Sequence, residues 1–152
     1  MKTIELSLSD LKGDLDEAYR YWDGLRGDAV GPSWAEFDLM AVPLRLVPTT
    51  MVYDIAEPYS LSVLRFWGSG MTEIHGRDMT GKSVRELCPS DLTDLVWEEY
   101  AEILKRRNPI WFEITAHIDD SHEFQFQSLR MPLRGDGQNI DRIFGICRNR
   151  YS

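Results

Sequence analysis

The chain has 152 residues and a mass of 17.6 kDa, which corresponds to one domain large enough to bury a core. Its formal net charge of −8 opposes binding to nucleic acid, because such binding depends on basic side chains that neutralise phosphates. No apolar run approaches the ~20 residues of a membrane span, and the N-terminus lacks the apolar core of a signal peptide. Cys88 and Cys147 belong to no CxxC pattern and fit reduced thiols. We therefore expect a cytoplasmic protein without nucleic-acid or membrane partners.

Near the N-terminus, apolar residues recur at helical spacing and predict an amphipathic helix over residues 10–26, with Gly27 at its C-terminal cap. Ser9 or Asp14 is expected to cap its start. The apolar face must be covered, and two partners remain open: the domain's own sheet or a second subunit. In the second case the helix forms a homodimer interface. The residues expected in that interface are Leu11, Leu15, Tyr19 and Trp22.

Residues 31–50 are expected to be an irregular connector, because three prolines interrupt regular structure there. Residues 51–55 and 61–68 then predict two short strands of a hairpin. A short helical piece over residues 71–75 follows directly. Parallel strands need a crossover of a dozen residues or more, so this layout favours an antiparallel sheet and an α+β fold.

The C-terminal half predicts a long helix that starts at Ser90 or Asp91 and ends before Pro109. Residues 110–118 alternate cleanly as a strand, and residues 140–148 form the last strand. Between them, the strand over residues 123–133 changes its apolar phase, which a β-bulge near Gln127 or Ser128 would explain. We expect three units: residues 1–30 as helix and cap, 31–50 as connector, and 51–150 as core domain.

This order of elements resembles a PAS domain, with a five-stranded antiparallel sheet, short connector helices and one longer helix. Several segments also match in this order and at this spacing: Tyr21-Trp22, Pro32, Val52-Tyr53-Asp54, Arg65-Phe66-Trp67-Gly68-Ser69, Gly76-Arg77-Asp78-Met79-Thr80-Gly81, Met131-Pro132-Leu133, Asp136-Gly137 and Ile143-Phe144-Gly145. On these segments the chain is similar to short stand-alone bacterial PAS-like proteins. The resemblance implies a sensory or interaction module that holds a small molecule between the sheet and the connector helices, often as a dimer and with a possible signalling partner.

Arg65 and His75 are the polar residues of most interest for this pocket. Arg65 lies in an apolar strand, where it must form an ion pair with Asp54 or Glu73 or bind a ligand carboxylate or phosphate. His75 could reach the pocket or cap a carbonyl. The ligand-binding residues expected are Arg65, Trp67, His75, Trp97, Tyr100, Phe112 and Ile114.

The ligand itself stays unknown at this stage. Haem is disfavoured because the helix over residues 90–107 contains no histidine to act as an axial ligand. A photoreactive flavin is disfavoured because the segment around Cys88 is not an Asn-Cys-Arg-Phe-type turn. No metal site is expected, since His117 and His122 flank acidic residues without a third imidazole or thiolate at a fixed spacing.

Catalysis is not expected, because the sequence has no GxSxG, HExxH or Walker motif. Two alternatives to a ligand-binding module remain open. One is a protein–protein or dimerisation module whose core is filled by its own aromatic residues. The other is a cone-shaped α+β enzyme of the ketosteroid-isomerase type, although that fold usually places its long helices before the sheet.

Overall fold

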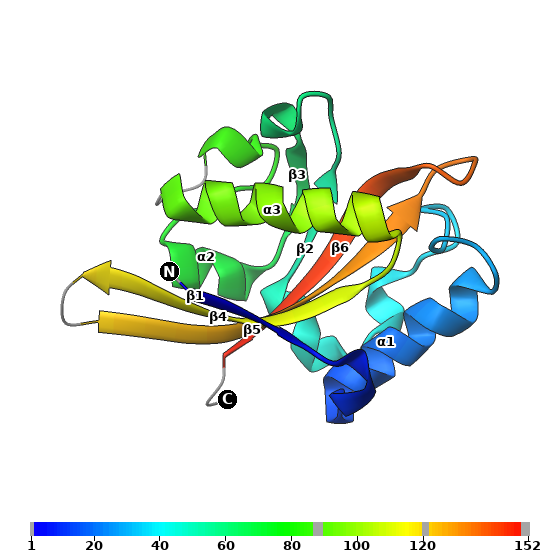
Figure 1. Cartoon of the computed structure of the whole chain (residues 1–152), viewed down its shortest axis with the longest axis horizontal. Helices are drawn as coiled ribbons and strands as arrows, with labels where there is room; N and C mark the ends of the chain where they lie inside the picture. Colours follow the sequence, from blue (N-terminus) through cyan, green and yellow to red (C-terminus); the bar gives the residue numbers. More distant parts are fainter. Residues whose placement is uncertain (1, 87–89, 120–121, 150–152) are drawn as a thin grey trace.

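A six-stranded antiparallel sheet organises the chain, with strand order β1-β4-β5-β6-β2-β3 (Figure 1). The computed structural model of the protein describes residues 2–86, 90–119 and 122–149. The α+β class and the five predicted strands are confirmed, and a sixth strand adds to them. The strands are β1 (Lys2–Leu6), β2 (Thr50–Asp54), β3 (Val63–Trp67), β4 (Ile110–Asp119), β5 (His122–Arg134) and β6 (Ile140–Asn149).

Three α-helices and several short 3₁₀ helices surround the sheet. The α-helices are α1 (Gly13–Arg26), α2 (Ser69–His75) and α3 (Ser90–Arg106); the 3₁₀ helices are η1 (Leu8–Asp10), η2 (Leu39–Ala41), η3 (Leu44–Thr49), η4 (Tyr59–Leu61) and η5 (Val84–Glu86). The first helix starts later than predicted, because Ser9 belongs to η1 and Lys12 holds the N-cap position. Gly27 ends the helix with a φ of 57°, as its placement predicted. Among the described residues, no helix is long and apolar enough to cross a membrane.

β1 was not predicted, and its exposure explains why. It pairs antiparallel with β4 at one edge of the sheet, from Lys2 opposite Thr115 to Leu6 opposite Trp111. Residues 2–5 are exposed, so backbone pairing holds the strand rather than a buried apolar face. The Glu5 carboxylate also forms an ion pair with Arg106 at the end of α3.

The sheet is buried on both faces, and each face has its own hydrophobic core. The inner core lies under α2 and α3; its buried residues are Val30, Met51, Tyr53, Leu64, Trp67, Met71, Met79, Val84, Tyr100, Ile103, Ile110, Phe112, Ile114, Ile140, Ile143 and Cys147. The outer core lies under α1; its buried residues are Leu11, Leu15, Ala18, Trp22, Phe37, Val42, Leu46, Val52, Trp111, Leu129, Met131, Leu133, Phe144 and Ile146.

The predicted bulge near Gln127 and Ser128 is wrong. Both residues pair in continuous register with β4, opposite Glu113 and Phe112, and the irregularity lies elsewhere in that pair, near His117. The apolar residues change phase because β5 is buried on both faces. Its apolar side chains pass from the inner core at one end to the outer core at the other without a change of pleat.

The apolar face of α1 packs on the chain's own sheet. Leu11, Leu15 and Trp22 are buried there within the protomer, and Tyr19 packs against them. The Trp22 indole Nε1 donates a hydrogen bond of 2.8 Å to the Pro132 carbonyl of β5. Within this chain, the α1 face thus packs as the first of the two open alternatives describes.

Candidate functional site

Five residues form one row across the inner half of the sheet. Ile110 of β4 pairs with Arg130 of β5, which pairs with Gly145 of β6. Gly145 pairs with Met51 of β2, and Met51 pairs with Trp67 of β3. The side chains of Ile110, Met51 and Trp67 belong to the inner core, and Gly145 has no side chain. The row therefore places a charged side chain on the face covered by α2 and α3.

Arg130 is buried in this row, with 3% of its surface exposed. Its side chain lies over Gly145: a Cβ at that glycine would be 2.9 Å from Arg130 Cδ and 3.1 Å from Cζ. The guanidinium Nη1 donates to Met51 Sδ at 2.9 Å. Its Cζ also lies 5.5 Å from the centroid of the Tyr53 ring, within cation–π range. The missing Cβ of Gly145 thus provides the space that the guanidinium occupies.

His75 and Trp67 lie at the end of the same row. The two rings pack with their centroids 5.1 Å apart, and His75 is the last residue of α2. Burial lowers the pKa of His75, and the positive charge of Arg130 lowers it further. The Trp67 Nε1 atom is buried and has no hydrogen-bond partner among the described residues.

Two tyrosines and a serine add hydroxyl groups to this face. Tyr53 and Tyr100 meet edge to face, with ring centroids 5.2 Å apart. The Tyr53 hydroxyl donates to Met51 Sδ at 3.0 Å. Ser128, two residues before Arg130 and on the same side of β5, is fully buried, with its Oγ 3.9 Å from Cys147 Sγ. We call Arg130, His75, Trp67, Tyr53, Tyr100 and Ser128 the inner polar cluster.

Most of the predicted ligand-binding residues lie on this inner face. Trp67, Tyr100, Phe112 and Ile114 are buried in the inner core, and His75 packs against Trp67. The structure brings these five to the same side of the sheet. Arg65 and Trp97 lie elsewhere.

Arg65 belongs to a cluster outside the inner face. It forms an ion pair with Asp54, at 2.8 Å between Nη2 and Oδ2, which is the first of the two roles considered for it. Arg142 binds the same carboxylate at 2.8 Å. Both guanidiniums lie over the Trp34 ring, which packs against the outer core. A bulge between β2 and β3, near Val52, alters the facing of β3, so Arg65 lies on the other side of the sheet from the inner face.

Trp97 is 39% exposed, so the structure does not place it as a buried pocket residue. Among the described side chains of α3, Tyr100 and Ile103 are buried in the inner core and Leu104 packs against it. Trp97 lies off the apolar stripe that contains them, and this offset is visible in the sequence.

Sequence reasoning missed Arg130, Ser128 and Gly145. The signal was present: a strand with buried apolar residues in both phases must have both faces covered, so polar residues between them are buried too. The change of phase in β5 was interpreted as a bulge, which hid Arg130. Gly145 lies opposite Arg130, a relationship that only the strand register reveals.

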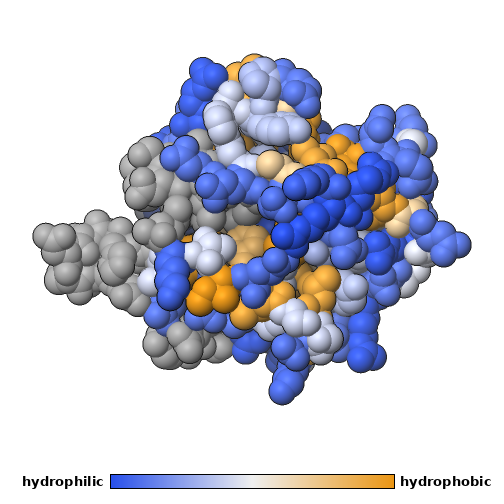
Figure 2. All heavy atoms as spheres, in the orientation of Figure 1, coloured by the Kyte–Doolittle hydropathy of each residue, from blue (hydrophilic) through white to orange (hydrophobic). Residues whose placement is uncertain are grey.

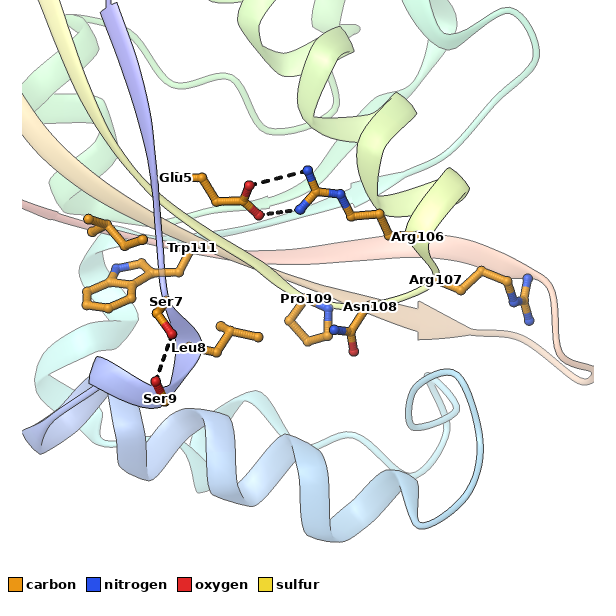
Figure 3. A pocket seen from close by; sticks show the side chains of 10 residues that line it. Glu5, Ser7, Leu8, Ser9, Arg106, Arg107, Asn108, Pro109 and Trp111 are labelled. Atoms are coloured by element: carbon orange, nitrogen blue, oxygen red, sulfur yellow. Dashed lines mark hydrogen bonds and ion pairs between the residues drawn. The ribbon is translucent and has the colours of Figure 1, made fainter.

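A separate surface pocket of about 680 Å³ lies where β1 and η1 meet the end of α3 (Figure 3). Leu6, Leu8 and Trp111 form its apolar part and belong to the outer core or pack against it. Its two arginines are bonded: Arg106 to Glu5 and Glu102, and Arg107 to the Gln138 carbonyl at 2.6 Å. This pocket is therefore distinct from the inner polar cluster, and its charged groups already have partners.

Two earlier expectations fall partly outside the described residues. Cys88 and Asp120 lie outside the residues that the structure describes, and so do the side chains of His117 and His122. Within the described ranges, no group of three His, Cys, Asp or Glu side chains could hold a metal ion.

Comparison with known proteins agrees with this fold. The sequence profile of the PAS domain family matches residues 13–148, so the chain belongs to the PAS domain family, as its order of elements and motif spacing predicted. PAS domains are generally sensory or signalling modules. No curated protein matches the sequence significantly.

Two solved structures illustrate the likeness. The PAS domain of a protein from Colwellia psychrerythraea has a TM-score of 0.50 and 16% identity, covering 74% of this chain and 97% of that domain. An RNA-binding light-oxygen-voltage receptor has a TM-score of 0.52 and 12% identity, covering 97% of this chain but 38% of the receptor. At these identities the likeness shows the fold alone.

Proposed function

We propose that this chain is a sensory or regulatory PAS module that binds a small molecule between the inner face of its sheet and helices α2 and α3. It acts on other proteins through dimerisation or through a signalling partner, and it carries out no catalysis. The observation that carries this proposal is the inner polar cluster, above all the buried guanidinium of Arg130.

Burying a guanidinium is costly, because the charge must leave water. Replacing buried charged groups by apolar residues of similar volume is often neutral or stabilising. Stability alone therefore gives little reason to bury an arginine at this position of β5. A site that must recognise a ligand does give such a reason, since a small number of polar groups in an apolar pocket fixes the ligand's orientation.

The cluster also lies where a signal can leave the domain. His75 ends α2, and Gly76 turns the chain there with a φ of 80°. Tyr100 lies on α3. A ligand that contacts this cluster would touch both helices, so its binding energy can shift their positions.

Native mass spectrometry of the gently purified protein, compared with its denatured mass, tests this function. We expect a non-covalent adduct on the folded protein that disappears on denaturation. Folded protein that carries no adduct, and whose melting temperature does not respond to a library of small metabolites, would contradict the proposal.

A second candidate is an interaction module without a ligand, and exposed apolar side chains favour it. Trp97 on α3 and Ile74 on α2 are exposed, at 39% and 47%. On the face that shows α3 and β1, apolar residues form small groups between hydrophilic ones (Figure 2). Here the expected result is binding of a protein partner that Trp97→Ala weakens, while the melting temperature stays insensitive to small molecules.

A further inference from the structure

Resting on the dimerisation named in the proposed function, we propose that two copies of this chain pair through β1. The two β1 strands run antiparallel about a two-fold axis at Ile4, so that the two sheets join into one continuous sheet. This surface differs from the α1 face, which packs on the sheet of its own chain.

The two edges of the sheet differ in whether their backbone is covered. At the β3 edge, the segment over residues 81–84 bonds to the outer side of the strand: Leu64 N donates to the Lys82 carbonyl at 2.9 Å, and Gly81 N donates to the Leu64 carbonyl at 2.7 Å. At the opposite edge, β1 pairs with β4, and no backbone bond to its other side occurs among the residues that the structure describes. Figure 1 shows β1 in front of β4 and β5. The outer N–H and C=O groups of β1 are therefore open to another strand.

β1 lacks the features that usually protect an exposed edge strand, which are a proline, a bulge or several charged residues. It contains no proline, and its register with β4 is continuous from Lys2 to Leu6. Of its two charged residues, Lys2 lies at the end, and Glu5 is bound by Arg106. Ile4, at the centre of the strand, is 48% exposed. An unprotected edge with an exposed apolar centre is typical of a strand that pairs with another.

Symmetry limits how two β1 strands can pair. Opposite residues of an antiparallel pair point to the same face, and a two-fold axis maps each face of the sheet onto itself. The pair must therefore be centred on one residue. A centre at Glu5 would place like charges opposite each other, and a centre at Thr3 would pair residues 2–4 alone. A centre at Ile4 aligns all of β1 in both copies and opposes no like charges.

In this register the side chains complement one another on both faces of the sheet. On the outer face, where Leu6 packs against the outer core, the two Ile4 side chains would meet. Lys2 of each copy would lie opposite Leu6 of the other, where a lysine can cover apolar surface with its stem and keep its ammonium in water. On the inner face, the Thr3 hydroxyl would lie opposite Glu5 of the second copy and can donate a hydrogen bond to its carboxylate. The pairing thus buries Ile4 and gives Glu5 a further partner.

The interface is small, so the dimer should form at high concentration. Two strands of five residues bury less than the ~1,600 Å² of a standard interface, which is typical of weak and transient contacts. We expect a monomer near ~5 µM and a rising share of dimer up to ~1 mM. Unfolding measured at low micromolar concentration therefore reports on the single chain. A weak dimer is also one that a small difference in ligand affinity between monomer and dimer can shift.

Analytical ultracentrifugation over this concentration range tests the inference. The proteins are the wild type, Ile4→Lys, Thr3→Lys and the matched control Ile74→Lys, which makes the same change of charge at a residue of α2 that is 47% exposed. We expect Ile4→Lys to raise the dissociation constant of the dimer roughly ten-fold or more, because two ammonium groups would lie side by side at the axis. Relative to Ile74→Lys, Thr3→Lys should lower it about two- to five-fold, because the new lysine would lie opposite Glu5 of the second copy.

Amide signals locate the interface. In ¹H–¹⁵N correlation spectra of the wild type, we expect the signals of residues 2–6 to move between ~50 µM and ~1 mM, while those of α1 and α2 stay in place. A chain that stays monomeric at ~1 mM, a dimer that Ile4→Lys does not weaken, or signal changes on α1 or α2 instead of β1 would overturn the inference. The wild-type spectra decide the matter even if a variant does not fold.

These outcomes are separate from the test of the proposed function. The small-molecule adduct is measured on the folded protein whether or not the chain dimerises. A monomer that carries the adduct would overturn the β1 pairing and leave the ligand-binding function in place. A dimer through β1 without an adduct, and without a response to small metabolites, would support the pairing and contradict the ligand-binding function.

Discussion

The side chain of Arg130 lies directly over Gly145, its cross-strand partner, in the space where a Cβ would stand. The pairing combines a buried charge with the one residue type that leaves room for it. It also directs the guanidinium toward Met51 and the Tyr53 ring. The fold thus presents a positive charge on the inner face of its sheet, under the helices that would respond to a ligand.

Gly145→Ala is expected to lower the free energy of unfolding by about 1–3 kcal/mol, because the new methyl group forces the buried guanidinium to move. Urea unfolding measures the change. Gly24→Ala is the matched control: a Cβ there meets nothing within 4 Å, and alanine in a helix should stabilise by about 0.5–1 kcal/mol. In an Arg130→Met background the Gly145→Ala penalty should shrink. An equal penalty in both backgrounds would show that the two residues do not interact.

Arg65→Met should lower stability by less than about 1 kcal/mol, because the Arg65 side chain is 44% exposed and Asp54 keeps its bond to Arg142. Ligand retention should not change. Thermal unfolding and native mass spectrometry of the same preparation check both statements. Loss of the adduct in this variant would instead show that Arg65 takes part in ligand binding.

His75 makes the stability depend on pH. Its pKa is lowered in the folded state by burial and by Arg130, so the unfolded state binds more protons once the pH falls below about 6.5. The free energy of unfolding should therefore decrease from pH 7 to pH 5 more steeply in the wild type than in His75→Phe, which keeps a ring against Trp67. Carboxylates titrate in both proteins and cancel in the comparison. Parallel pH profiles would contradict this account.

The ion pair between Glu5 and Arg106 helps to attach β1, in addition to the backbone pairing with β4 and the packing of Leu6 on the outer core. Arg106→Ala removes the contact with Glu5 and should weaken local stability by about 0.5–1 kcal/mol. Amide hydrogen exchange of residues 2–6 should then accelerate by roughly two- to five-fold, with little change in β6. Equal acceleration in β6 would mean that the substitution destabilises the whole domain. Arg20→Ala, which breaks an exposed Arg20–Asp16 pair on α1, is the control.

Trp22 anchors α1 to the sheet of its own protomer. Trp22→Ala should cost about 3–5 kcal/mol, and Trp22→Phe should cost about 1–2 kcal/mol through the lost bond to the Pro132 carbonyl. The unfolding midpoint of both variants should be independent of protein concentration. A midpoint that rises with concentration in the wild type but not in Trp22→Ala would indicate that the α1 face is shared between subunits.

Periodicity predicted the elements whose two sides differ in burial. Regular spacing identified α1, and clean alternation identified β4 with Phe112 and Ile114 facing inward. It failed where side-chain pattern carries no information about pairing. β1 has few buried side chains, so no pattern marks it.

In the candidate site, too, some residues could be predicted from the sequence and others could not. Aromatic residues such as Trp67 and Tyr100 were predicted because a pocket on this fold needs apolar walls. Arg130 was missed because the change of apolar phase in β5, which marks a strand covered on both faces, was interpreted as a bulge. Arg65 was selected because it interrupts an apolar strand, yet a change of register turns it toward Asp54.

The indole N–H signals of the tryptophans give the most direct test of the central claim, a small molecule bound under α2 and α3. We would record them by ¹H–¹⁵N correlation spectroscopy, assign them through Trp→Phe variants, and compare the gently purified protein with protein that has been unfolded, washed free of small molecules and refolded. The account predicts that the signal of the buried Trp67 differs between the two preparations and that the signal of the exposed Trp97 stays in place. A Trp67 signal that is the same in both preparations would contradict a small molecule held between the inner face of the sheet and these helices.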